Sequence, residues 1–270
     1  MLGSELASKL SSHELLQTDH ADIDISNEQA VLNFCKQNRP DVVINSAAFT
    51  NVDACETEKD LAWRVNAWGC RNIALASSSV GARLFSISTD YVFGGNSPRP
   101  YHEFDIANGG QTVYGQTKLA GEQFISQLCP NHLIVRVAWL YGNNGKNFVN
   151  TMLSLAAKNL SEIKVVNDQI GNPTSTAAVA NLINDLLNTD YRGIVHGTCE
   201  GSATWYDFAT AIFELSGTPQ KVVPCTSKEF VRPAPRPKNS RLEKRVIQML
   251  GLRPMPEWKA ELAKYLNTPI

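Results

Sequence analysis

Hydrophobic residues recur along the chain in two alternating patterns, one with helical spacing and one typical of buried strands. Leu2, Leu6 and Leu10 recur on one helix face, whereas 41–45 (DVVIN) and 132–137 (HLIVRV) are short runs rich in β-branched residues. The helical pattern predicts helices over 2–10, 27–38, 62–80, 113–128, 148–158, 177–187 and 257–266. The strand pattern predicts strands over 14–18, 41–45, 83–88, 132–137, 163–166 and 193–197.

Helices and strands alternate up to about residue 145, which predicts a parallel sheet covered by helices on both faces. The fold class is therefore α/β, a Rossmann-like doubly wound parallel sheet. Beyond residue 145 the alternation loosens, and the strand at 193–197 is expected to return to the main sheet. We expect one domain over 1–145 with a return segment at about 175–198, and a smaller C-terminal lobe formed by 146–174 and 199–270.

Composition narrows the function classes. The 270 residues carry a formal net charge of -1, with no clustered Lys and Arg that would indicate nucleic-acid binding. No hydrophobic run reaches the ~20 residues that cross a bilayer, and no signal-peptide pattern follows Met1. The six cysteines lack the CxxC spacing of zinc sites and predict buried thiols in a reducing compartment. We therefore expect a cytoplasmic protein with no nucleic-acid or membrane partner and no indicated metal ligands.

Tyr114 and Lys118 are four residues apart on a predicted helix, so they share one face of it. A phenol titrates near ~10 in water, and an adjacent ammonium group favours its phenolate form. Such a pair can protonate a carbonyl oxygen while hydride arrives at carbon. Thr89 follows the strand at 83–88, where its hydroxyl could hydrogen-bond the same oxygen. The alternatives are a surface helix pair and a hydroxyl that caps local backbone.

Six segments follow one another along the chain and form a specific set of motifs. They are 88–93 (STDYVF), 113–122 (VYGQTKLAGE), 136–141 (RVAWLY), 167–174 (NDQIGNPT), 204–206 (TWY) and 236–241 (RPKNSR). Together they resemble the dTDP-4-dehydrorhamnose reductase family of extended short-chain dehydrogenases/reductases. The resemblance implies an oxidoreductase that uses NADPH or NADH to reduce the 4-keto group of a dTDP-4-dehydro-6-deoxy sugar, converting dTDP-4-dehydrorhamnose to dTDP-rhamnose for cell-surface polysaccharide.

The resemblance also implies roles for single residues. Tyr114 would give its proton to the 4-keto oxygen, Lys118 would hold the nicotinamide ribose and lower the pKa of Tyr114, and Thr89 would complete the catalytic group. The main domain would bind NAD(P), with further contacts from Gly3, Asp19, Asp24, Ile25, Ala48, Phe49 and Thr50. The sugar would be lined by Asp90 and Trp139.

Each of these assignments has a plainer alternative. Asp19 is equally an exposed acid in a turn, and Trp139 equally a core aromatic residue. Arginine pairs well with phosphate oxygens, so we expect Arg236 or Arg241 to hold the sugar diphosphate, unless both are solvated charges. Asp19 favours NADH, whereas neighbouring His20 could tolerate the additional phosphate of NADPH.

The first residues depart from the family pattern. A Rossmann unit normally begins with a strand that leads into a GxxGxxG loop, and this loop binds the pyrophosphate. Here Leu2 to Leu6 match the segment after the loop, and Gly3 matches its last glycine. We therefore expect the first strand and the glycine loop to be missing, in a fragment of a longer protein or in a degenerate relative. The sheet should then have a gap or an unpaired edge, and NAD(P)H binding should be weak or absent.

Two other functions are compatible with this fold. A non-catalytic regulatory subunit resembling that of methionine adenosyltransferase is favoured by the incomplete glycine loop. It is disfavoured by the presence of Thr89, Tyr114, Lys118 and Trp139. A nucleotide-sugar dehydratase or epimerase is the third reading; dehydratases need Asp-Glu directly after the threonine, but Asp90 is followed by Tyr91. Simple reduction fits better. The expected partner is a nucleotide-sugar substrate, and a homodimer stays open.

Overall fold

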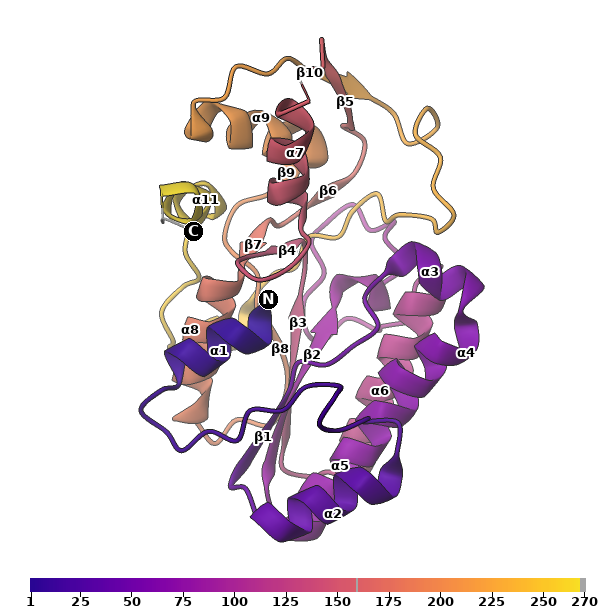
Figure 1. Ribbon diagram of the computed structural model, residues 1–270, viewed down its shortest axis with the longest axis vertical. Coiled ribbons are helices and arrows are strands. Elements are labelled where there is room, and N and C mark those ends of the chain that lie inside the picture. Colours follow the sequence, from indigo (N-terminus) through magenta and orange to yellow (C-terminus); the bar gives the residue numbers. More distant parts are fainter. Residues whose placement is uncertain (159, 268–270) are drawn as a thin grey trace.

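A four-stranded parallel sheet lies at the centre of the computed structural model, which describes residues 1–158 and 160–267 (Figure 1). Its strands, in hydrogen-bonded order, are β1 (Val42–Asn45), β2 (Arg83–Thr89), β3 (His132–Val137) and β8 (Gly193–His196). Every neighbouring pair is parallel. The predicted parallel sheet is confirmed, and the strand predicted at 193–197 does return to it beside β3.

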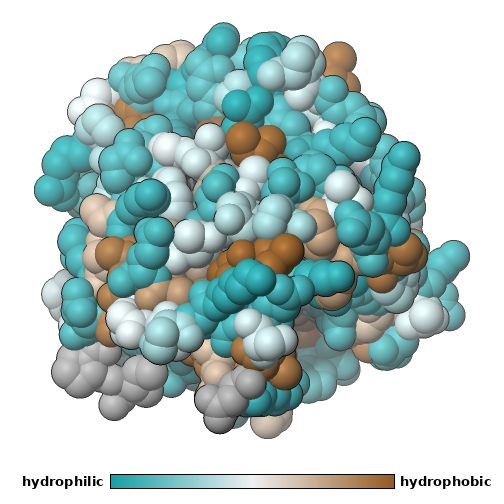
Figure 2. Space-filling view, turned by 90° about the horizontal axis from the view of Figure 1, so that it is seen from above, coloured by the Kyte–Doolittle hydropathy of each residue, from teal (hydrophilic) through white to brown (hydrophobic). Residues whose placement is uncertain are grey.

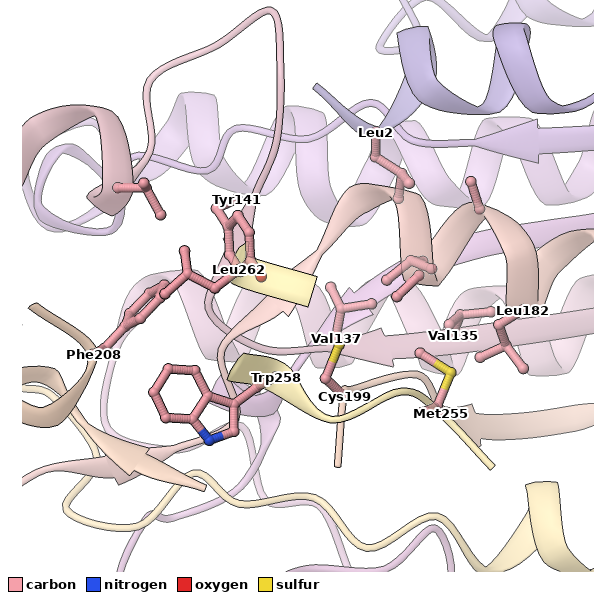
Figure 3. Packing of buried hydrophobic residues seen from close by; sticks show 14 of the residues in the cluster. Leu2, Val135, Val137, Tyr141, Leu182, Cys199, Phe208, Met255, Trp258 and Leu262 are labelled. Atoms are coloured by element: carbon pink, nitrogen blue, oxygen red, sulfur yellow. The ribbon is translucent and has the colours of Figure 1, made fainter. Parts of the chain in front are cut away.

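Helices cover both faces of this sheet (Figure 1). They are α2 (Glu28–Asn38), α5 (Gly69–Val80) and α6 (Val113–Leu128) on one face, and α1 (Leu2–Lys9) and α8 (Thr176–Leu187) on the other. Alternate residues of a strand point to opposite faces. Ile134 accordingly belongs to the core beneath α2 and α5, whereas Leu133 and Val135 belong to the core beneath α1 and α8. Figure 3 shows Leu2 and Leu182 on this second side.

Residues 14–18 form no strand, so this prediction is wrong. Leu16 in this segment is 54 % exposed, and no strand in the described part of the chain pairs with it. A strand is stable only when its backbone groups find partners in a ladder, and here a hydrophobic pattern without such a neighbour leaves an irregular segment. Among the described residues, β1 is an edge strand of the sheet and pairs only with β2.

The helix predicted over 62–80 is divided by a π-helical turn. α4 (Lys59–Ala62) leads into the turn at Trp63–Trp68, and α5 then begins at Gly69. A side chain at Gly69 would overlap Ile25, so the absence of a Cβ allows the loop before α2 to approach. Because π-helical turns are rare and often lie at functional sites, the Trp63–Trp68 turn is a candidate part of the site.

The chain beyond β3 builds a second group of short elements around the end of the sheet (Figure 1). Its helices are α7 (Phe148–Ala156), α9 (Trp205–Ser216), α10 (Arg245–Met249) and α11 (Trp258–Asn267). Its paired strands are β5 (Ile163–Val166) with β10 (Val222–Cys225), β4 (Leu140–Tyr141) with β7 (Thr174–Ser175), and β6 (Ile170–Gly171) with β9 (Ala203–Thr204). The remaining elements are α3 (Val52–Thr57) and a 3₁₀ turn at Asp90–Val92. Helices α3, α4, α9 and α10 were not predicted from the sequence.

One hydrophobic core joins the second group to the sheet. Figure 3 shows Tyr141, Phe208 and Trp258 continuing from the residues beneath α1 and α8, and all of them belong to the same buried cluster. Seen from the end that carries β5 and β10, the surface is mostly hydrophilic with separate small hydrophobic areas (Figure 2). Among the helices described, none combines the length and the apolar character needed to cross a bilayer.

Candidate active site

The carboxyl ends of β1, β2 and β3 meet at one edge of the sheet, where ligands of open α/β sheets bind. Thr89 is the last residue of β2, and Trp139 lies just beyond β3. Residues 46–50 follow β1 in the same way. This edge therefore collects most of the residues that the sequence singles out.

Tyr114 lies in the first turn of α6 and is buried, and the Thr89 side chain is near enough to its phenol to influence the phenol's pKa. Thr112 caps the helix by accepting a hydrogen bond from the Gly115 amide at 3.0 Å. A Cβ on Gly115 would overlap the carbonyl oxygen of Tyr91, so glycine lets the helix start close to the end of β2. The local sequence thus holds the phenol and the hydroxyl together.

Lys118 lies one turn further along α6 and is also buried. Its ammonium group donates a hydrogen bond to the carbonyl oxygen of Ile87 at 2.8 Å, two residues before Thr89. Helical spacing puts Lys118 on the same face as Tyr114. The structure therefore brings the three predicted groups, Thr89, Tyr114 and Lys118, to the end of β2.

Burial raises the pKa of Tyr114 above its ordinary value, although the nearby Thr89 side chain acts in the opposite direction. Removal of the phenol from water is the largest effect on this pKa, and the expectation that Lys118 lowers it stays a prediction. The phenol is consequently held in its protonated form. That is the form that can donate a proton.

Asp90 begins the 3₁₀ turn after Thr89 and is only 3 % exposed. The Thr89 hydroxyl donates a hydrogen bond to Asp90 Oδ1 at 2.9 Å. Oδ2 is buried and has no hydrogen-bond partner in the described residues. Burial raises the pKa of Asp90 to about 7, well above its usual range.

Asn66 is a site residue that sequence reasoning missed. It lies in the π-helical turn, fully buried, and accepts a hydrogen bond from the Phe49 amide at 2.8 Å. Its amide group donates to the Phe49 carbonyl oxygen at 3.1 Å and to Thr117 at 3.2 Å. One side chain thus joins the loop after β1 to α6. Its place four residues after Ala62 and four before Cys70, both buried, was the available signal.

Trp139 has a left-handed backbone, with φ of 47°, which is uncommon for a bulky residue and typical of functional sites. Its indole stacks on Trp205, with ring centroids 3.6 Å apart and planes at 7°. A side chain at Gly171 would overlap the Trp139 ring, so the stack is enclosed from that side too. Both rings are half-buried and form a rigid aromatic wall. Trp205 was not predicted as part of it.

The residues predicted to contact a cofactor fall into two groups. Ala48, Phe49 and Thr50 lie beyond β1, and a Cβ on Gly3 would come within 3.0 Å of Ser46 Oγ in the same loop. Asp19 and Asp24 lie instead in local turns before α2. Asp19 Oδ1 accepts from the Ala21 amide at 2.7 Å, and Asp24 Oδ1 from the Ser26 amide at 2.9 Å. Ile25 packs against Gly69.

The two arginines predicted to hold a diphosphate lie in different surroundings. Arg236 forms an ion pair with Asp53 of α3 at 3.0 Å, which ties the segment after β10 to the loop region beside Phe49. Arg241 donates to Asn239 Oδ1 at 2.9 Å and to the Pro98 carbonyl oxygen at 3.2 Å. The described residues contain no cluster of three or more His, Cys, Asp or Glu side chains that could hold a metal ion.

Comparison with known families gives a match over residues 1–269 to the family described as RmlD substrate binding domain. The spore coat polysaccharide biosynthesis protein SpsK of Bacillus subtilis is 40 % identical over 268 residues, 98 % of this chain and 93 % of the relative. The dTDP-4-dehydrorhamnose reductase of Streptomyces griseus is 42 % identical over 273 residues, 98 % of this chain and 89 % of the relative.

Solved structures give the same result. A dTDP-4-dehydrorhamnose reductase from Clostridium acetobutylicum is 47 % identical with a TM-score of 0.96, and the match covers 98 % of this chain and 95 % of that one. A dTDP-4-dehydrorhamnose reductase from Bacillus anthracis in complex with NADP is 40 % identical with a TM-score of 0.95, covering 98 % and 94 %.

Proposed function

Because this chain belongs to the RmlD substrate binding domain family, we propose that it reduces the 4-keto group of a dTDP-4-dehydro-6-deoxy sugar with NADPH or NADH. The product would be dTDP-rhamnose when the substrate is dTDP-4-dehydrorhamnose. The observation that carries this proposal is the meeting of Thr89, Tyr114 and Lys118 at the carboxyl end of β2.

The bound dinucleotide supplies the hydride when present. Tyr114 gives its phenolic proton to the sugar O4 as that oxygen becomes charged, and Thr89 holds the phenol in line. Lys118 directs its ammonium group to the same edge, where it would bind the ribose hydroxyls beside the nicotinamide. Because Tyr114 is buried, water has little access to its phenolic proton, and the proton is transferred to the sugar oxygen.

The residues beside β1 suit a dinucleotide. Gly3 has no side chain to fill the space beside Ser46, and Asn66 fixes Phe49, so Gly3, Ala48, Phe49 and Thr50 would hold the cofactor. The carboxylates of Asp19 and Asp24 accept hydrogen bonds from backbone amides of their own turns, and Ile25 packs against Gly69. Contacts from these three to the adenosine would need that loop to change.

The substrate would lie between the sheet edge and the C-terminal lobe. Asp90 and the Trp139–Trp205 stack would line the sugar. Arg236 is the better candidate for the diphosphate because its ion pair with Asp53 of α3 holds it beside the loop that follows β1; Arg241 is the second. We propose the division into a cofactor domain (1–145 with 175–198) and a substrate lobe (146–174 and 199–270) on this basis. We also propose a cytoplasmic location, which suits six free buried thiols, and a homodimer.

Replacement of Tyr114 by Phe tests the proposed function. At saturating NADPH, the wild-type protein should oxidise NADPH when dTDP-4-dehydrorhamnose is added. The fall in NADPH absorbance measures this reaction. Tyr114→Phe removes the proton donor and should lower kcat by ~10²-fold or more with a small change in KM. Tyr191→Phe, which loses a hydroxyl bonded to the Ile194 carbonyl oxygen, is the matched control and should keep wild-type turnover.

A Tyr114→Phe variant with wild-type kcat would contradict the assignment of the proton donor. A folded wild type that oxidises no NADPH with this sugar would contradict the reductase function itself. That second result would favour the non-catalytic regulatory subunit considered above.

A further inference from the structure

Helix α3 lies beside the start of α6, the helix that carries Tyr114 and Lys118 (Figure 1). Glu56 is near the end of α3, and its Oε1 accepts a hydrogen bond from the Val113 amide at 2.9 Å. Val113 is the first residue of α6, and Tyr114 is the second. A side chain 57 residues upstream thus binds the backbone directly before the reactive phenol.

The first turn of any helix has amides without partners inside the helix, and it frays unless other groups accept hydrogen bonds from them. In α6, the Thr112 hydroxyl accepts from the Gly115 amide at 3.0 Å, and Glu56 accepts from the Val113 amide. A carboxylate at this end also interacts favourably with the positive end of the helix dipole. The local cap therefore serves one amide of the turn, and a distant residue serves another.

The phenol ring is located by packing between the same two helices. Tyr114 and Val113 share a small buried cluster with Cys55 of α3 and Ala62 of α4. The Tyr91 ring meets the Tyr114 ring edge-on, with centroids 5.5 Å apart. Side-chain packing and a backbone hydrogen bond thus join the first turn of α6 to α3. A shift of this turn would move the phenolic oxygen.

The position of α3 is itself fixed by its neighbours. Its N-cap Asn51 accepts a hydrogen bond from the Ala54 amide at 3.1 Å. Asp53 accepts from the Ala234 amide at 3.1 Å and pairs with Arg236 at 3.0 Å, which attaches α3 to the segment after β10. The carboxylate that α3 presents to α6 therefore has a fixed position.

We propose that Glu56 is a positioning residue for Tyr114, which holds the first turn of α6 so that the phenol reaches the sugar oxygen. The inference rests on the proposed reductase function. Glu56 acts through the Val113 amide and takes no proton from the reaction. Proton transfer needs donor and acceptor within about 3 Å, and a misplacement of ~1 Å can cost ~10²-fold in rate. Loss of the Glu56 contact should therefore reduce kcat more than it weakens substrate binding.

Glu56→Ala tests this role, because it removes the acceptor of the Val113 hydrogen bond. At saturating NADPH and sugar, we expect kcat to fall ~10-fold, while both KM values stay within about twofold of wild type. Glu56→Gln keeps an oxygen that can accept the same hydrogen bond and should recover most of the lost kcat. Glu229→Ala is the matched control and should keep wild-type kinetics. Glu229 Oε1 also accepts from a backbone amide, that of Thr226, at 2.9 Å.

Three kinetic outcomes would overturn the proposal. They are wild-type kinetics in Glu56→Ala, an equal loss of kcat in Glu56→Gln, and a rise in KM with unchanged kcat. The last would make Glu56 a substrate contact. Circular dichroism and thermal unfolding establish that each variant is folded.

Hydrogen exchange of the ligand-free protein gives a second readout, which in the wild type needs neither turnover nor a variant. The Val113 amide should be protected to the same degree as the capped Gly115 amide of the same turn. In Glu56→Ala it should exchange ~10-fold faster, as expected for losing one hydrogen bond to a charged group, while Ile125 further along α6 stays unchanged. A wild type with an unprotected Val113 amide overturns the positioning role even if the enzyme is active. A wild type with a protected Val113 amide that oxidises no NADPH overturns the proposed function instead.

Discussion

Asn66 shows how much one buried side chain can determine at a site. Its amide uses both the carbonyl oxygen and the NH₂ group, joining Phe49 after β1 to Thr117 on α6. The π-helical turn places this side chain between the two elements. The position of the loop that would contact the cofactor therefore depends on hydrogen bonds from a third segment.

We expect Asn66→Ala to raise the KM for NADPH severalfold and to lower stability by ~1–3 kcal/mol, because backbone groups of Phe49 lose their buried partner. Asn147→Ala is the matched control. Asn147 is also buried, donates to the Gly142 carbonyl oxygen at 2.8 Å and caps α7. Denaturant unfolding should show similar losses in both variants, while steady-state kinetics should change in Asn66→Ala alone. Equal kinetic effects would contradict a specific role for Asn66.

At the scale of elements, α6 is fixed to the sheet by a buried ion pair. Arg136 of β3 binds Glu122 of α6 through Nε at 2.9 Å and Nη2 at 2.6 Å, with side chains 3 % and 5 % exposed. The guanidinium also lies over the Phe93 ring at 4.9 Å. This bidentate contact sets the position of the helix that carries Tyr114 and Lys118.

Glu122→Leu should lower the free energy of unfolding by ~3–5 kcal/mol, because it leaves the Arg136 charge buried without its partner. Adding Arg136→Met should recover much of that loss, since a hydrophobic pair of similar volume avoids the desolvation of two charges. Glu162→Ala breaks the surface pair with Lys221 and should cost no more than ~1 kcal/mol. Chemical denaturation measures all three. A double variant no more stable than Glu122→Leu would refute this account.

At the scale of the whole molecule, the C-terminal segment is locked to the sheet near the end of β8. His196 Nδ1 donates to the Glu243 carbonyl oxygen at 2.9 Å, since a carbonyl can only accept. Glu103 accepts hydrogen bonds from the backbone amides of His196, Arg245 and Val246. Burial lowers the pKa of His196 to about 3, so the ring is neutral in the folded protein.

Stability should fall as pH decreases from about 6.5 towards 3. In that range the unfolded chain protonates this histidine and the folded one does not, so the unfolded state binds more protons. The contribution is at most ~1.4 kcal/mol per pH unit. Urea unfolding across this range should give a shallower pH slope for His196→Gln than for the wild type. The exposed His20, replaced by Gln, is the control that should keep the wild-type slope; equal slopes in all three proteins would disprove the prediction.

Local sequence signals were sufficient for most of the sheet and its helices. The spacing of hydrophobic residues predicted the bounds of α1, α2, α6, β2 and β3 to within a few residues. Amphipathic spacing and capping depend only on residues a few positions apart. The four-residue spacing of Tyr114 and Lys118 likewise put both side chains on one helix face. A Thr204–Asp207 capping box marks the start of α9 and could have predicted that helix as well.

The amino-acid sequence by itself thus determined the α/β alternation, the order of the motifs and the Tyr114–Lys118 face. Tertiary structure alone decided that 14–18 is not a strand, that Trp205 stacks on Trp139, and that burial raises the pKa of Tyr114 and Asp90. The physical reason is range. Periodicity and capping depend on residues a few positions apart, whereas strand pairing, ring stacking and desolvation depend on segments that only folding brings together.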